Sequence, residues 1–201
     1  MNKAIFEISY KISMELEGYY SDSLHDKGGE TVNGISRVYF PEWAGWEIVD
    51  ELKSKFKITD IPYQIKKSEV IQELTAAFYK NEFWDKSMCG SMPQSIANEV
   101  FDTGINQGRK TAIIYLQKSL NLLNRDEKDY KDIDPDGSMG NNTKLSLDLY
   151  FKTQHYASRN FEQLQKCLLR WLNFYQLKRI ENLAIREPSQ EKWIMGWTYR
   201  C

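Results

Sequence analysis

The sequence predicts a mostly helical α+β protein with a short β-hairpin after its first helix. Apolar residues recur at helical spacing along most of the chain, whereas the stretch 15–36 has almost no core formers and contains a glycine pair that permits a tight reversal. The chain has 201 residues, of which 41% are hydrophobic and 13% aromatic, enough to bury one good core. We therefore expect a single domain over residues 1–201, without repeats or an interdomain linker.

Charge and cysteine usage exclude several classes of protein. The net charge of −1 gives no field that would attract nucleic acid, and no apolar run is long enough to insert into a membrane. Three widely spaced cysteines fit neither a disulfide framework nor a metal site and indicate reduced thiols. The first residues lack the apolar core of a signal peptide, so we expect a protein made in the cytoplasm.

The first helix is expected to end at Gly18, with Ile5, Ile8, Ile12 and Leu16 on its inward face. Glu17 then lies in the last helical turn. A carboxylate is poorly placed there, because the C-terminal end of a helix carries partial negative charge. This position favours a functional role for Glu17.

Two polar residues follow Glu17 at short range. Asp26 and Thr31 flank the Gly28-Gly29 pair, and a reversal there would bring both opposite Glu17. Two carboxyls across a gap are the arrangement that glycoside hydrolysis needs, one as acid and one as base for water. The alternative is a solvated loop after a helix that Gly18 terminates.

The runs 17–22 (EGYYSD), 26–29 (DKGG) and 31–36 (TVNGIS) resemble the signature of glycoside hydrolase family 108. These are peptidoglycan-cleaving N-acetylmuramidases of phages and prophages, once described as secretion activators. Tyr19 stands where the family usually has Gly, and Lys27 where it has Pro. Neither departure affects a group that would take part in the chemistry.

The resemblance implies a lysozyme-like fold, with helices around a cleft, and hydrolysis of the β-1,4 bond between N-acetylmuramic acid and N-acetylglucosamine. Glu17 would be the general acid, and Asp26 and Thr31 would position water. Because Thr31 has a task only with a bound water, we expect inversion at the anomeric carbon. The resemblance implies no cofactor or metal, peptidoglycan glycan strands as the partner, and holin-dependent release of an endolysin.

Seven further residues are candidates for substrate binding: Tyr19, Tyr20, Asp22, Asn33, Trp84, Asp102 and Asn106. Trp84 belongs to a Phe-Trp-Asp motif that is similar to one in the family. Asp102 and Asn106 lie four residues apart on one helix face, within a Val-Phe-Asp…Asn sequence that the family places near its cleft. A polar helix face beside a glycine hinge is the alternative. Trp43 and Trp46 could stack on sugars, although burial is expected for at least one.

The remaining helices are expected at 48–56, 68–84 with Ser68 as N-cap, 95–105, 110–123 and 145–150. A long helix running to about residue 182 should bury one stripe, which consists of Phe161, Leu164, Cys167, Leu168, Trp171, Tyr175 and Ile180.

The loop 124–142 begins like a calcium loop, but Pro135 and the absence of a Glu at the twelfth position argue against a metal. Residues 136–143 (DGSMGNNT) instead resemble the turn of the peptidoglycan-binding module that accompanies the family, with Thr143 capping the next helix. The end of the chain (Gly196-Trp197…Arg200) resembles the family's closing motif. Two sequence modules follow, a catalytic one at 1–105 and a peptidoglycan-binding-like one at 106–201.

Two other functions stay open. One is a non-catalytic protein that binds the cell wall or assists secretion, which would not need an acid at a helix end. The other is a cysteine hydrolase, but only His25 and His155 could serve Cys89 as a base, and no local signature supports it.

Overall fold

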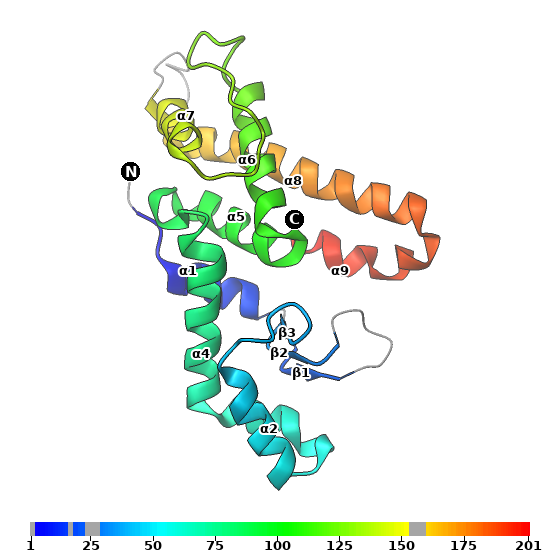
Figure 1. Ribbon diagram of the computed structural model, residues 1–201. Helices are drawn as coiled ribbons and strands as arrows, with labels where there is room; N and C mark the ends of the chain where they lie inside the picture. The colour runs from blue at the N-terminus through cyan, green and yellow to red at the C-terminus, as the bar shows by residue number, and fades with distance from the viewer. Residues whose placement is uncertain (1–2, 16–17, 23–28, 153–159) are drawn as a thin grey trace. The chain divides into compact units, whose positions relative to one another are not determined.

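The computed structural model describes residues 3–15, 18–22, 29–152 and 160–201. The described chain is mostly helical and contains one three-stranded antiparallel sheet, which confirms the predicted α+β class (Figure 1). No helix in these ranges is both long enough and apolar enough to cross a membrane.

The chain forms two compact units. The small unit comprises residues 10–82, and the large unit comprises residues 1–9 and 83–201. The large unit joins α5 (Gln94–Gln107) to α6 (Arg109–Leu122) and α8 (Phe161–Arg186), so its limits do not follow the module boundary expected near residue 106. Whether the two units act as a single domain stays a prediction.

The small unit packs three helices beside the sheet. Strands β1 (Tyr20–Ser21), β2 (Thr31–Val32) and β3 (Ile35–Ser36) precede α2 (Gly45–Lys55), a 3₁₀ helix (Ile58–Asp60), α3 (Ile61–Lys67) and α4 (Glu69–Tyr79). Its fully enclosed side chains are Val32, Ile35, Val49, Ile61, Ile65, Ile71 and Tyr79. Ser68 caps α4 as expected, because its hydroxyl accepts from the Ile71 amide at 3.3 Å.

Helix α1 (Phe6–Met14) presents a different face from the one predicted. Ile5, Ile8 and Ile12 are 43–52% exposed, whereas Phe6, Ser9 and Ser13 are buried. The Ser9 hydroxyl donates to Asn98 Oδ1 at 2.6 Å, so a satisfied serine can occupy the interior. Apolar spacing therefore gave the wrong face; Leu16 lies outside the described residues.

The large unit contains the remaining helices. A π-helical segment (Lys80–Asp85) leads into it, and a 3₁₀ helix (Cys89–Ser91) precedes α5 and α6. After α7 (Asn141–Lys152) and α8 come a 3₁₀ helix (Pro188–Trp193) and α9 (Ile194–Thr198). None of the three cysteines, all of which lie in described ranges, forms a disulfide.

Two expectations for this unit are wrong. The buried stripe of α8 is Leu164, Leu168, Leu172, Gln176 and Ile180, while Phe161 is exposed and Cys167, Trp171 and Tyr175 are only half-buried. Thr143 does not cap α7: it lies inside the first turn, where its hydroxyl donates to the Ser138 carbonyl and accepts from Gln117 Nε2.

Candidate functional site

The three short strands form a meander in the small unit. Tyr20 pairs with Val32, and Thr31 pairs with Ser36. The link between β2 and β3 is the Asn33-Gly34 turn, in which both residues have positive φ, 47° and 81°. Asn-Gly is the strongest short-range hairpin signal, and this turn was not among the sequence-based expectations.

Helix α4 holds this turn from one side. The Tyr79 hydroxyl donates to the Asn33 carbonyl at 2.8 Å, and Asn33 Nδ2 donates to Thr75 Oγ1 at 3.1 Å. Asn33 is only 6% exposed. The side chain predicted to contact substrate thus has an internal partner and fixes the turn after Thr31.

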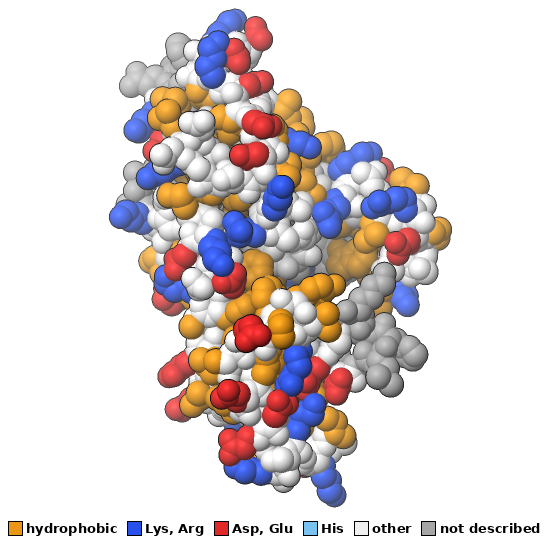
Figure 2. All heavy atoms as spheres, viewed as in Figure 1, with side chains coloured by type: hydrophobic (Ala, Val, Ile, Leu, Met, Phe, Trp, Pro, Cys, Tyr) orange, Lys and Arg blue, Asp and Glu red, His pale blue; other side chains and the backbone are white. Residues whose placement is uncertain are grey.

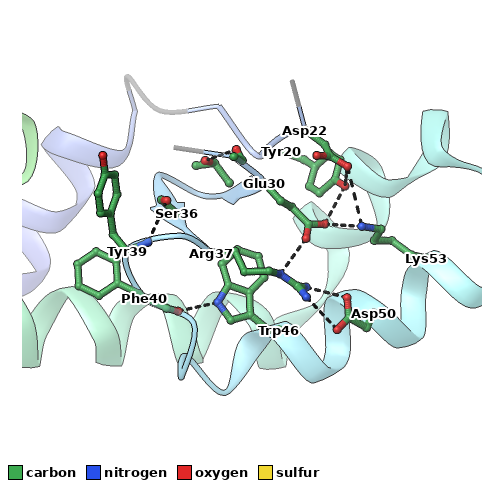
Figure 3. Close-up of polar contacts among 12 residues, drawn as sticks. Tyr20, Asp22, Glu30, Ser36, Arg37, Tyr39, Phe40, Trp46, Asp50 and Lys53 are labelled. Atoms are coloured by element: carbon green, nitrogen blue, oxygen red, sulfur yellow. Dashed lines mark hydrogen bonds and ion pairs between the residues drawn. The ribbon is translucent and has the colours of Figure 1, made fainter. Parts of the chain in front are cut away.

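Glu30 is the centre of a polar network that joins the meander to α2 (Figure 3). Its side chain is 10% exposed, and its carboxylate lies 2.7 Å from Lys53 Nζ and 2.8 Å from Arg37 Nε. The Tyr20 hydroxyl donates to the same carboxylate at 2.9 Å. Two cations and a phenol therefore compensate the burial of this charge.

Arg37 carries the network onward to α2. Its guanidinium makes two hydrogen bonds to Asp50, at 2.7 and 3.1 Å, and lies 4.5 Å above the Trp46 ring. The hydrogen bond to Asp50 raises the pKa of Arg37 and lowers that of Asp50. Burial, followed by the bond to Glu30, raises the pKa of Tyr20, so its hydroxyl stays a donor at neutral pH.

Thr31 lies on β2, directly after Glu30. Its hydroxyl donates to the Gly29 carbonyl at 3.1 Å. Because a hydroxyl has one proton and two lone pairs, this bond uses the donor and leaves acceptor capacity on the oxygen. The meander therefore holds a half-buried acceptor oxygen at the position predicted to bind water.

Of the other predicted residues of the hairpin, the structure describes Tyr19 and Asp22. Glu17 and Asp26 lie outside the described residues. Tyr19 is 41% exposed, and Lys66 Nζ lies 5.1 Å from its ring. The Asp22 carboxylate is exposed and 4.0 Å from Lys53 Nζ.

An open hollow of about 600 Å³ lies between the segment after β3 and α4. Its lining is largely aromatic and apolar and includes Tyr39, Phe40, Trp43 and Phe78. The polar groups in the lining are the carboxylates of Glu42 and Glu82 and the amide of Asn81. Tyr39 is 67% exposed, whereas Trp43 and Trp46 are buried and donate their indole N–H groups to backbone carbonyls. Of these three rings, only that of Tyr39 is exposed.

Three predicted residues lie in the large unit. Trp84 is 5% exposed and makes edge contacts with Phe6 and Phe101, at 5.7 and 5.8 Å between ring centroids. Asn106 Nδ2 donates to the Asp102 carboxylate at 2.9 Å, and Arg200 Nη1 donates to Asn106 Oδ1 at 2.8 Å. Two sequence motifs 94 residues apart therefore meet, which the spacing alone did not indicate.

Sequence reasoning missed Glu30, Arg37 and Lys53. Glu30 lies between Gly29 and Thr31, but its partners Arg37 and Lys53 lie seven and twenty-three residues further along the chain. Within the described ranges, no three or more His, Cys, Asp or Glu side chains are grouped so as to hold a metal ion.

Comparison with known proteins gives matches along nearly all of the chain. Residues 10–108 match a family model described as Glycosyl hydrolase 108, and residues 111–201 match one described as Predicted Peptidoglycan domain. The structure is similar to that of Brucella abortus SagA, with a TM-score of 0.62 and 19% identity over 97% of this chain and 88% of that chain. This likeness concerns the fold. A search of curated proteins found no match.

Proposed function

The chain belongs to glycosyl hydrolase family 108 with a following peptidoglycan domain, and from this premise we propose that it is an N-acetylmuramidase. The reaction would cleave the β-1,4 bond between N-acetylmuramic acid and N-acetylglucosamine. The observation that carries the proposal is the order of the two matches, a glycosyl hydrolase followed by a peptidoglycan domain in a single chain. Together they support a glycoside hydrolase whose substrate is peptidoglycan.

In this proposal Glu17 protonates the leaving glycosidic oxygen, and Asp26 takes a proton from the attacking water. Both roles rest on the motif resemblance. Thr31 adds structural support, because its hydroxyl donates to Gly29 and can accept a hydrogen bond from that water. A water between acid and base requires the carboxyls to stand about 6.5–9.5 Å apart and gives the inverted anomer.

The hollow beside the meander fits a glycan strand. Sugar rings have apolar faces that pack on aromatic rings, and their hydroxyl and N-acetyl groups need polar partners at the rim. Tyr39 supplies an exposed ring, and Asn81, Glu42 and Glu82 supply polar groups. Trp46 donates to the Phe40 carbonyl beside Tyr39, and Arg37 lies over the Trp46 ring. Because Arg37 also pairs with Glu30, these contacts connect the hollow to the residue that precedes Thr31.

The test compares Glu17→Gln with Glu15→Gln, an exposed carboxyl two residues away. Purified peptidoglycan is digested with each protein, and the new reducing ends are reduced with borohydride and identified. We expect the wild type and Glu15→Gln to yield reduced muramic acid, and Glu17→Gln to yield almost none while keeping its melting temperature.

Three results would contradict the proposal. Reduced glucosamine in place of muramic acid would mean that the enzyme cuts the other glycosidic bond. Equal release by Glu17→Gln and wild type would remove Glu17 from the chemistry. A wild type that binds peptidoglycan without cutting it would favour the non-catalytic, secretion-accessory alternative.

A further inference from the structure

Two adjoining hollows lie along α8 in the large unit, with volumes of about 200 and 510 Å³. They share Arg179 and Leu183 in their lining, so they lie next to each other. We call the pair the α8 groove. Helices α5 and α9 contribute to one end and α6 to the other.

The α8 groove is basic although the chain as a whole has a net charge of −1. Five cations line it: Lys118, Lys178, Arg179, Arg186 and Arg200. No Asp or Glu is among the described residues that line either hollow. Figure 2 shows Lys and Arg side chains gathered over the α8 region.

Some of these cations already have partners. Lys178 pairs with Glu181 at 2.6 Å on the exposed surface, and Arg200 is held by Asn106 and lies 3.8 Å from Asp102. Arg179 hydrogen-bonds the Tyr115 side chain. Among the described residues it makes no ion pair with a carboxylate, and it lines both hollows. It is the cation best placed to receive an anionic ligand.

The floor of the α8 groove is aromatic and aliphatic. Tyr115 and Tyr175 stack with 5.5 Å between ring centroids and 19° between planes, and Lys118 Nζ lies 5.9 Å from the Tyr175 ring. At the other end, Trp197 and Ile180 supply apolar surface. The groove therefore offers positive charge above a surface that accepts small apolar side chains.

From this combination we propose that the α8 groove binds the carboxylates of peptidoglycan stem peptides. The inference rests on the proposed function, because it takes peptidoglycan as the substrate. Stem peptides carry free carboxylates and methyl side chains, whereas the glycan strand between them offers neutral sugars. Guanidinium groups bind carboxylates in bidentate fashion, and aromatic floors pack against short side chains. Most of the lining also lies within the match to the peptidoglycan domain.

The test measures binding without catalysis. Three probes are titrated into the full chain by calorimetry: a synthetic stem pentapeptide with free carboxylates, the same peptide with every carboxylate amidated, and an N-acetylglucosamine oligomer. The variant is Arg179→Gln, and the matched control is Arg170→Gln, an exposed arginine on α8 that lines neither hollow. A parallel pair is Trp197→Ala with Trp193→Ala, since Trp193 is 54% exposed and outside the groove.

We expect Arg179→Gln to raise the Kd of the free peptide about five- to tenfold, as the loss of one charge-assisted contact predicts. Arg170→Gln and Trp193→Ala should leave the Kd unchanged, Trp197→Ala should raise it, and the amidated peptide should bind more weakly than the free one. Melting temperatures confirm that each variant is folded.

Equal binding of the free and amidated peptides would overturn the inference, as would absence of binding by either peptide. A groove that binds only a phosphate polymer, such as a soluble teichoic acid, would also overturn it. The peptide-binding inference and the muramidase proposal can fail independently. If only the muramidase proposal is correct, Arg179→Gln should cleave peptide-free glycan strands like wild type. If wild type cleaves no glycan, the peptide titrations still decide whether the groove binds carboxylates.

Discussion

Glu99 on α5 should make the stability of the large unit depend on pH. Its carboxyl accepts from Gln176 Nε2, a side chain that is 2% exposed. Burial is the main cause that raises the pKa of Glu99 from 4.5 to about 7; the nearby Asp102 charge adds to the rise, and the Gln176 bond opposes it. The folded protein therefore binds this proton more tightly than the unfolded chain does.

The sign of the effect follows from linkage. Below pH 4.5 both states are protonated, and the stabilisation is fully present. Between pH 4.5 and about 7 the folded protein keeps a proton that the unfolded chain has released, so the free energy of unfolding falls as the pH rises through this window. Above about 7 both states release the proton, and the loss is complete. The difference between the two pKa values corresponds to a loss of about 3 kcal/mol.

The perturbation is Glu99→Gln, which resembles the protonated acid at every pH. Urea titrations at pH 5, 6, 7 and 8 give the free energy of unfolding for wild type, for Glu99→Gln and for Glu73→Gln, an exposed carboxyl on α4. The advantage of Glu99→Gln over wild type should grow by about 2.5 kcal/mol from pH 5 to pH 8, because the first part of the loss occurs below pH 5. A gap that stays constant with pH would show that Glu99 is not desolvated in the way described.

Four other outcomes can be checked. Glu30→Gln leaves Arg37 and Lys53 without their shared anion, so it should lower the free energy of unfolding by about 3 kcal/mol and reduce hydrolysis; unchanged urea midpoints would refute this. Tyr39→Ala should raise KM more than it lowers kcat, whereas Tyr63→Ala, at an exposed tyrosine on α3 that lies outside the hollow, should not. Trp84→Ala should cost about 3–5 kcal/mol and Trp171→Ala less, because only Trp84 is buried. Proton NMR of the first-formed sugar should show the α anomer; initial β product would exclude inversion.

The helices were predictable because their signals are local. Apolar spacing and the Ser68 cap located α4 and α5 to within a few residues, but they could not identify the buried side of α1. That side depends on Asn98, 89 residues from Ser9 along the chain. The face of a helix is set by its tertiary partner, and a polar partner makes a serine suitable for the interior.

The candidate site was predictable in part. The motif run 17–36 led to the proposed chemistry and included Thr31, yet the network beside Thr31 depends on strand register and on the approach of α2. Glu30 becomes important only when Arg37 and Lys53 converge on it. The Asn33-Gly34 turn is different, since its dipeptide alone predicts a reversal with positive φ at both residues.

The attachment of the meander to α4 has a consequence for how the small unit opens. Strands of two residues make too few ladder hydrogen bonds to be stable alone. The contacts of Tyr79 and Thr75 with Asn33 therefore stabilise them. The sheet cannot detach while α4 keeps those contacts. Amide deuterium exchange in β2 and β3 should therefore follow the same cooperative opening as α4, and Tyr79→Phe should make the strand amides exchange before those of the helix.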